Sequence, residues 1–232
     1  MQLTDLIYHR KNFLSKEQCQ FLIETYAKES SRSQLEHCEE ASTGIDTYST
    51  FNRIDLKIGT DAWQLVHSAT EQMINEYHDY LDSFDAFHID FRTTLKYSHM
   101  YRLLKYDTGA KIHPHTDHGP FVYGSCTFNL NDDYTGGDFA WFKGKHKLKL
   151  GLGDALIFPA DYFWVHEVLP ITSGVRYSTN SFLQKIPEHV RNQVYDYTDF
   201  LMGKPNQPED VRRELEASYR IRPKSAVKKQ IL

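Results

Sequence analysis

The stretch "KYDTGAKIHPHTDHGPFVYGSCTFNLN", residues 105–131, holds the features that decide the fold. Its second half is a short run of β-branched, aromatic and small residues, with Gly and Pro before it and Asn after it. Such a run is typical of a β-strand. Its first half places side chains that can bind a metal or a proton close together, namely His113, His115, Asp117 and His118. The stretch therefore predicts a strand-rich core that carries a chemical site.

The same texture of short strand-like runs extends on both sides of this stretch, from residue 97 to residue 186. The runs are separated by the turn sequences "NDDYTGG", "GLGD" and "TSG". Many short strands with regular turns favour an antiparallel sandwich, barrel or jelly roll. We therefore expect a mainly β fold with flanking helices (α+β), with its β core in residues 97–186.

Helical patterns precede this core. Residues 13–30 offer Ser15 as an N-cap, with Gln18 three residues later as the second half of a capping box. Residues 60–81 place apolar side chains on one stripe at helical spacing. Both segments therefore predict amphipathic helices.

Helical spacing also returns after Pro187, and residues 211–232 hold seven basic and two acidic side chains. We expect residues 1–96 to form an N-terminal support region of helices and strands that belongs to the same domain. Residues 187–232 are expected to form a C-terminal helical extension with a basic tail.

Composition narrows the class of protein. Hydrophobic residues make up 40% of the 232 residues and aromatic residues 14%, which is a globular composition rich in strand formers. The net charge of -4 gives no general attraction to nucleic acid. Three cysteines without a CxxC pair, a charged N-terminal segment and no long apolar run predict a soluble cytoplasmic protein, without signal peptide or membrane span.

One group of residues suggests a metal site. His115 and Asp117 are two positions apart, so in an extended strand both side chains point to the same face. His166 follows in the strand-like run "WVHEVLP". Two imidazoles and one carboxylate are the ligand set of non-haem Fe(II) oxygenases, which leaves coordination positions open. Arg176 lies among apolar strand residues and offers a planar guanidinium for the far end of a dicarboxylate cosubstrate.

The run from Tyr106 to Phe182 resembles the 2-oxoglutarate- and Fe(II)-dependent dioxygenases of the prolyl 4-hydroxylase type. The resemblance rests on the tyrosine before the HxD motif and on the segments "CTFNLNDDYTGGDF" and "GDALIFP". It also rests on "HEVLPITSGVRY", which follows the family pattern His-x-x-x-Pro-x-x-x-Gly-x-Arg. A double-stranded β-helix (jelly-roll) core is the fold that this resemblance implies.

The resemblance also implies roles for individual residues. The metal ligands, which are the catalytic set, are expected to be His115, Asp117 and His166. The 2-oxoglutarate site is expected to use Arg176, Tyr106, Ser125, Thr127 and Asn129. The substrate pocket is expected to involve His113, Tyr123, Phe182 and Arg53. Fe(II), 2-oxoglutarate and O2 are the implied cofactors and cosubstrates, with ascorbate as a reductant.

The implied activity is hydroxylation of a peptidyl proline or a similar C–H bond, with release of succinate and CO2. The substrate would be a peptide, a protein or a small molecule. Residues 42–59 are expected to contain strand and loop, and their Gly, Ser, Thr and Asn content favours a mobile lid over the site. His118 has the wrong strand parity for a ligand and is expected to face solvent.

Two other kinds of function stay open at this point. A cupin-like metalloenzyme would use His113, His115 and His166, and would have no need of Arg176. A jelly-roll binding module would hold a structural metal or none, and would be inert toward 2-oxoglutarate. Action on nucleic-acid bases is disfavoured by the net negative charge.

Overall fold

The computed structural model describes residues 1–40, 45–86, 95, 97–117 and 121–190. Its two α-helices are α1 (Lys16–Lys28) and α2 (Asp61–Asp82). The predicted capping box at the start of α1 is confirmed, because Ser15 accepts a hydrogen bond from the Gln18 backbone and the Gln18 side chain accepts one from the Ser15 backbone. Thr60 caps α2 in the same way, by accepting from the Trp63 N–H.

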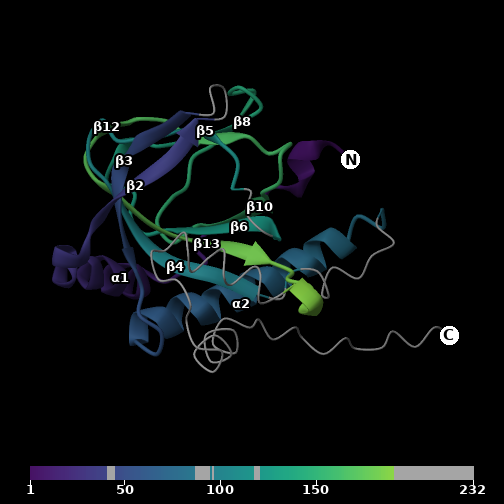
Figure 1. Ribbon diagram of the computed structural model, residues 1–232, viewed down its shortest axis with the longest axis horizontal. Coiled ribbons are helices and arrows are strands. Elements are labelled where there is room, and N and C mark those ends of the chain that lie inside the picture. The colour runs from purple at the N-terminus through teal and green to yellow at the C-terminus, as the bar shows by residue number, and fades with distance from the viewer. Residues whose placement is uncertain (41–44, 87–94, 96, 118–120, 191–232) are drawn as a thin grey trace.

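A seven-stranded sheet, the main sheet, forms the centre of the molecule, with the strand order β1-β10-β6-β13-β4-β3-β2 (Figure 1). Every neighbouring pair in it is antiparallel. In chain order the strands are β1 (Tyr8–Arg10), β2 (Gln34–Glu40), β3 (Ile45–Asp55), β4 (Tyr97–Tyr106), β6 (Val122–Asn129), β10 (Ala155–Pro159) and β13 (Arg176–Gln184). The main sheet therefore joins the N-terminal third of the chain to the predicted core.

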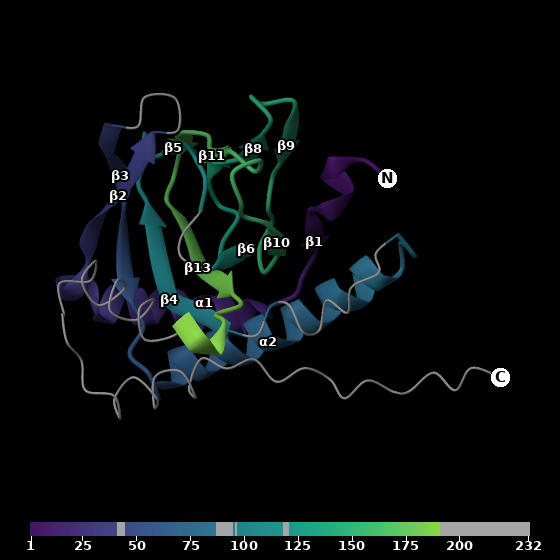
Figure 2. The same cartoon turned by 45° about the vertical axis from the view of Figure 1, so that its right-hand side comes forward.

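A four-stranded sheet, the minor sheet, lies over one face of the main sheet, with the order β5-β11-β8-β9 (Figure 2). Its strands are β5 (Ile112–His115), β8 (Phe139–Trp141), β9 (His146–Leu148) and β11 (His166–Val168). A further pair, β7 (Thr135–Gly136) and β12 (Ile171–Ser173), closes one end. Single-turn 3-10 helices occur at Leu3–Leu6, Ser30–Arg32 and Glu188–Val190. This is the expected mainly β, jelly-roll architecture with flanking helices.

The two faces of the main sheet differ in chemistry, as the alternation along β6 shows. Cys126 and Phe128 point outward, toward the two helices, and belong to the largest apolar cluster, which also contains Leu22 of α1 and Met73 of α2. Ser125, Thr127 and Asn129 point inward, toward the minor sheet, and are buried although polar. The helices therefore stabilise the outer face, and the inner face carries buried polar groups next to smaller apolar clusters that include Leu156 and Phe158.

Most of the segment predicted as a mobile lid, which was expected to contain strand and loop, is strand. Ile45–Asp55 form β3, an 11-residue strand that pairs with β2 on one side and β4 on the other. β-Branched and aromatic residues in this segment favour a strand more strongly than its Ser, Thr and Asn content favours a loop. Residues 41–44 lie outside the described residues.

The division into residues 1–96, 97–186 and 187–232 stays a prediction. The first segment supplies three strands of the main sheet, so it is covalently and structurally continuous with the core. The helices predicted after Pro187 and the basic tail lie outside the described residues, except for the short turn at Glu188–Val190. Within the described part of the chain, no helix has both the length and the apolar character that a membrane span needs.

Candidate metal centre

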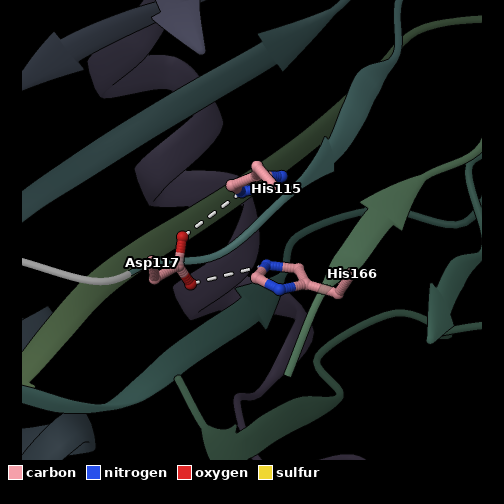
Figure 3. Close-up of side chains that lie close together, drawn as sticks. All are labelled: His115, Asp117 and His166. Atoms are coloured by element: carbon pink, nitrogen blue, oxygen red, sulfur yellow. Dashed lines mark ion pairs between the residues drawn. The ribbon is translucent and has the colours of Figure 1, made fainter. Parts of the chain in front are cut away.

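His115, Asp117 and His166 come together at one end of the minor sheet (Figure 3). His115 is the last residue of β5 and His166 is the first of β11, and the two face each other directly in the antiparallel pairing. Asp117 follows β5 by two residues. One ligand atom from each side chain can be chosen so that all three lie within 4.8 Å of one another.

The two histidines present their Nε2 atoms to the same carboxylate. The distance is 3.3 Å from His115 Nε2 to Asp117 Oδ1, and 3.4 Å from His166 Nε2 to Asp117 Oδ2. Neighbouring ligands at about 2.1 Å from an octahedral cation lie about 3 Å apart. Both imidazole–carboxylate distances are therefore close to the distance between neighbouring ligands on one metal ion.

Backbone carbonyls fix the tautomers of both rings. His115 Nδ1 donates to the His113 carbonyl at 2.8 Å, and His166 Nδ1 donates to the Trp164 carbonyl at 3.0 Å. Because a carbonyl can only accept, each neutral ring carries its hydrogen on Nδ1 and keeps a lone pair on Nε2. Two lone pairs then face an acceptor carboxylate, an arrangement that a cation between them would stabilise.

The protonation states favour metal binding. Burial lowers the pKa of His166 to about 4, although the Asp117 carboxylate opposes that shift, so this ring is neutral at physiological pH. Burial on its own raises the pKa of Asp117, but His166, His115 and a hydrogen bond from Ser125 hold it well below its ordinary value. A neutral imidazole and an ionised carboxylate are the forms that bind a divalent metal.

Aromatic side chains wall the cluster. The Phe158 ring meets the His166 ring edge-on at 4.8 Å between centroids. The Trp141 ring stacks against the same His166 ring at 6.5 Å between centroids. Trp141 is fully buried, and its Nε1 has no hydrogen-bond partner among the described residues. These rings exclude water and leave one buried donor beside the cluster.

Arg176 is a second unusual group, located deeper between the sheets. Its exposed fraction is 0%, and its Cζ lies 4.9 Å from the centroid of the Tyr106 ring and 5.3 Å from that of Phe139. Nε donates to Asn129 Oδ1 at 3.0 Å. Neither Nη1 nor Nη2 has a hydrogen-bond partner, and no described carboxylate forms an ion pair with Arg176. A buried, uncompensated guanidinium is costly unless an anion binds to it.

Tyr106 sits directly opposite Arg176 in the β4–β13 pairing. Burial raises the pKa of its phenol, and the cation of Arg176 only partly opposes this. The phenol is therefore a neutral O–H donor beside the guanidinium. Ser178, two residues further along β13, is also buried and interacts with the Tyr106 phenol. Buried hydrogen-bond donors thus gather in the place where the sequence predicts a dicarboxylate.

The predicted polar face of β6 has two functions in the structure. Ser125 interacts with Asp117, while Asn129 contacts Arg176. Thr127 lies between them on the same inward face and is buried. Direct contacts from these three residues to a cosubstrate stay a prediction.

The residues predicted for the substrate pocket are more scattered. Tyr123 is 47% exposed and lies where the β6–β13 pairing shifts its register, while the half-buried Phe182 pairs with Ser125 in the same two strands. His113 is outside the three-residue cluster and contributes its carbonyl to His115. His118 lies outside the described residues.

Arg53 is not available in the way that the sequence suggests. Its guanidinium forms ion pairs with Glu36 through Nε and with Asp55 through Nη1, the latter at 2.5 Å. Glu36 also pairs with the buried Arg102 at 3.2 Å. Arg53 is therefore part of a compensated cluster rather than a lone donor for a peptide backbone.

The double-glycine turn explains why Arg176 fits where it does. A Cβ on Gly137 would lie 2.6 Å from Ile171 Cδ1 and 3.3 Å from Arg176 Cδ, and one on Gly136 would lie 2.2 Å from the Pro170 carbonyl oxygen. Both glycines also have positive φ. The turn can therefore approach the guanidinium only because side chains are absent.

Sequence reasoning missed Tyr134, Phe139 and Trp141. All three flank the double-glycine turn and are buried between the sheets. The aromatic residues in "DDYTGGDFAWF" are the signal that could have found them, because they alternate around a turn next to the predicted anion site.

Comparisons with known proteins agree with the sequence pattern and with the geometry of the site. Residues 101–184 match the family model of the 2OG-Fe(II) oxygenase superfamily. A PKHD-type hydroxylase of Cupriavidus metallidurans is 30% identical over 124 residues, which cover 50% of this chain and 54% of that protein. One of Xylella fastidiosa is 38% identical over 66 residues, or 27% of this chain and 28% of that protein. The chain thus aligns with about half the length of the first of these relatives, and with less of the second.

Solved structures share the fold. A prolyl 4-hydroxylase of Pseudomonas putida superposes with a TM-score of 0.59 at 17% identity, over 78% of this chain and 94% of that one. A prolyl hydroxylase of Trichoplax adhaerens, solved with a peptide fragment of hypoxia inducible factor, gives a TM-score of 0.59 at 14% identity, over 78% of this chain and 84% of that one.

Proposed function

We propose that the protein is an Fe(II)- and 2-oxoglutarate-dependent hydroxylase, because residues 101–184 match the family model of the 2OG-Fe(II) oxygenase superfamily. Its substrate would be a peptidyl proline or a similar C–H bond, and its coproducts would be succinate and CO2. The observation that carries this proposal is a pair of features between the two sheets: the His115, Asp117 and His166 cluster, and the uncompensated Arg176.

The residues present fit the implied groups. Two neutral imidazoles and one carboxylate are a donor set for Fe(II) that leaves adjacent positions for a chelating ligand and dioxygen. The orphaned Nη1 and Nη2 of Arg176 fit the distal carboxylate of 2-oxoglutarate, because a guanidinium binds a carboxylate with two parallel hydrogen bonds. When bound, iron and 2-oxoglutarate supply the oxidising chemistry that cleaves a C–H bond.

The chain itself supplies orientation and a dry environment. His115 and His166 keep their Nε2 lone pairs directed at the cluster, because their Nδ1 hydrogens are held by backbone carbonyls. Arg176 and the neutral phenol of Tyr106 would hold the far end of the cosubstrate. Phe158 and Trp141 exclude water from the ligand side of His166.

A peptide or protein substrate is the part of the proposal that rests on analogy. The Trichoplax adhaerens structure was solved with a peptide, and it shares only the fold at 14% identity. Tyr123 and Phe182 offer aromatic surface at the end of the inward face nearest Asp117, which suits an uncharged side chain such as proline. Ascorbate would serve as the reductant that keeps the iron ferrous.

The test is anaerobic addition of Fe(II) followed by 2-oxoglutarate, with detection of a weak visible charge-transfer band. Admission of air with proline-containing peptides should then yield succinate and a mass gain of about 16 Da. Ala variants of His115, Asp117 or His166 should each lose iron, because a three-ligand site does not tolerate the loss of one ligand. His113→Ala is the matched control, and this variant should keep most of its bound iron.

The outcomes separate the alternatives. Equal damage from His113→Ala and His115→Ala would favour the cupin-like ligand set. Iron binding without any response to 2-oxoglutarate would favour a non-catalytic binding module. Turnover of free amino acids or nucleic acid, with none of any peptide, would remove the peptidyl substrate and keep the dioxygenase.

A further inference from the structure

Asn129 occupies an unusual position behind Arg176. Its Oδ1 accepts hydrogen bonds from Arg176 Nε at 3.0 Å and from the Tyr134 hydroxyl at 3.1 Å. Its Nδ2 donates to backbone carbonyls, at 2.6 Å to Asn131, 3.3 Å to Leu150 and 3.1 Å to Gly151. The side chain is 0% exposed, so every polar atom of this amide is already engaged within the protein.

These partners allow only one orientation of the amide. Rotating it by half a turn would place the NH2 group against the N–H of Arg176 and the O–H of Tyr134, and the oxygen against the three carbonyls. The backbone of Asn129 is also fixed, since its N–H donates to the Asp154 carbonyl and its own carbonyl accepts from Gly153, both at 2.9 Å. Asn129 is therefore a rigid support for the guanidinium.

An amide has a property here that other side chains lack. An aspartate would place an oxygen against the carbonyls of Leu150 and Gly151, and would neutralise the charge of Arg176. An alanine would leave Nε without a partner. Asparagine orients the guanidinium through Nε and adds no negative charge. The full positive charge of Arg176, and its Nη1 and Nη2, therefore remain available to a ligand.

We propose that Asn129 and Tyr134 are positioning residues for the cosubstrate, which set its affinity through Arg176 and do not contact it. This inference rests on the proposed function, because it takes the ligand of Arg176 to be the distal carboxylate of 2-oxoglutarate. It also replaces the expectation that Asn129 contacts the cosubstrate itself. The side chain has no hydrogen-bonding capacity left for such a contact.

The test measures binding of two 2-oxo acids to the anaerobic, Fe(II)-loaded protein by titration calorimetry. 2-Oxoglutarate has the distal carboxylate and pyruvate lacks it. Asn129→Ala should lower the affinity for 2-oxoglutarate by about tenfold or more, which is the usual consequence of losing one hydrogen bond to a charged group. Its affinity for pyruvate should stay at the wild-type value, because pyruvate does not reach Arg176.

A double-mutant cycle then separates an indirect role from a direct one. In the Arg176→Ala background, Asn129→Ala should have no further effect on 2-oxoglutarate affinity, because the residue acts only through the guanidinium. An undiminished effect in that background would overturn the proposal, since Asn129 would then touch the ligand. An equal loss of affinity for both 2-oxo acids would also overturn it, by indicating general damage.

Tyr134→Phe keeps the proposal testable if Asn129→Ala does not fold. It removes only the hydroxyl that donates to Asn129 Oδ1. We expect a loss of about two- to fivefold in 2-oxoglutarate affinity, again absent for pyruvate and in the Arg176→Ala background. An unchanged affinity would remove Tyr134 from the proposal. Failure of wild-type protein to bind 2-oxoglutarate would instead overturn the proposed function.

Discussion

Two buried arginines lie on the inward face of the main sheet, and their surroundings differ sharply. Arg102, 5% exposed, donates through Nε to Asn180 Oδ1 at 2.9 Å, pairs with Glu36 at 3.2 Å, and lies over the Phe182 ring. Arg176, 0% exposed, has the same kinds of amide and ring contacts but no carboxylate among the described residues. The carboxylate is the difference between a structural arginine and one prepared for an anionic ligand.

This comparison teaches how to separate the two roles. Both residues are buried, and both are held by an asparagine through Nε, so neither burial nor orientation distinguishes them. Charge compensation does. Arg102 is part of a cluster in which Glu36 and Asp55 compensate Arg102 and Arg53. An arginine whose charge is already compensated gains little from a new anion.

The largest effect should come from Arg176→Ala. Removing one partner of a desolvated charge pair costs about 3–5 kcal/mol, so affinity for 2-oxoglutarate should fall several hundred-fold or more while iron binding is kept. Arg176→Lys should be milder but not neutral, because a point charge replaces a planar fork. Titration calorimetry of the Fe(II) protein checks both. Unaltered 2-oxoglutarate-dependent succinate formation in Arg176→Ala would mean that the carboxylate is held elsewhere.

A smaller effect on the same ligand is expected for Tyr106→Phe. It removes one neutral O–H donor from beside the guanidinium, which is worth about 1.5–3 kcal/mol for a hydrogen bond to a charged group. Stacking of the ring against Phe51, at 4.8 Å between centroids, should be preserved. The measurement is again the dissociation constant of 2-oxoglutarate. A loss as large as that of Arg176→Ala would point to a collapsed site instead of one missing bond.

Arg102→Ala should produce the opposite pattern. We expect the free energy of unfolding to fall by about 1–3 kcal/mol, because Asn180 loses its partner and Glu36 keeps only Arg53. Affinity for 2-oxoglutarate should stay close to the wild-type value. Urea unfolding and calorimetry on the same preparation test the two halves. A large loss of 2-oxoglutarate affinity with unchanged stability would reverse the roles assigned to the two arginines.

The smallest expected effect is on the pH dependence of stability, through the carboxylate of Asp154. Burial raises the pKa of Asp154, but backbone N–H groups of Gly151 and Asn12 and the ring of His9, at 2.8 Å, hold it below its ordinary value. A depressed pKa in the folded state stabilises the protein above the unfolded-state pKa, and this stability is lost as the pH falls through the folded-state pKa.

Urea unfolding from about pH 6 to about pH 3 measures this contribution. Asp154→Asn should be less stable than wild type near neutrality and should lose less stability on acidification. Arg176→Ala should keep the wild-type slope, because a guanidinium does not titrate in this range. A wild-type slope in Asp154→Asn would show that other carboxylates carry the acid response.

Much of the fold and the site could be predicted from the sequence, since local signals carry them. The capping box at Ser15, the apolar stripe of α2 and the alternation around Ser125 depend on neighbours within a few residues. The cluster of His115, Asp117 and His166 could be predicted because His115 and Asp117 lie close together in the sequence and His166 fits a family pattern. The contacts of Arg53 could not, because its ion pair with Glu36 depends on how β2 and β3 pair.

The same reason explains what was missed or wrong. The segment of β3 was expected as strand and loop with a mobile lid, because its polar residues are common in loops and its pairing with β4 is a long-range contact. The role of Asn129 depends on Tyr134 and on carbonyls beyond the next turn, at Leu150 and Gly151. A strand pattern tells which face a side chain occupies, but not which atoms meet it there.

The pairing of His115 with His166 also has a consequence for the mechanical integrity of the molecule. These residues end or begin strands of only 4 and 3 residues, and they come from distant parts of the chain. A cation held by both would act as a cross-link that closes a loop of about 50 residues, and it would remove chain entropy from the unfolded state as a disulfide does. The minor sheet would then be the first part of the molecule to loosen under a chelator, while the main sheet, with its helices, would stay folded.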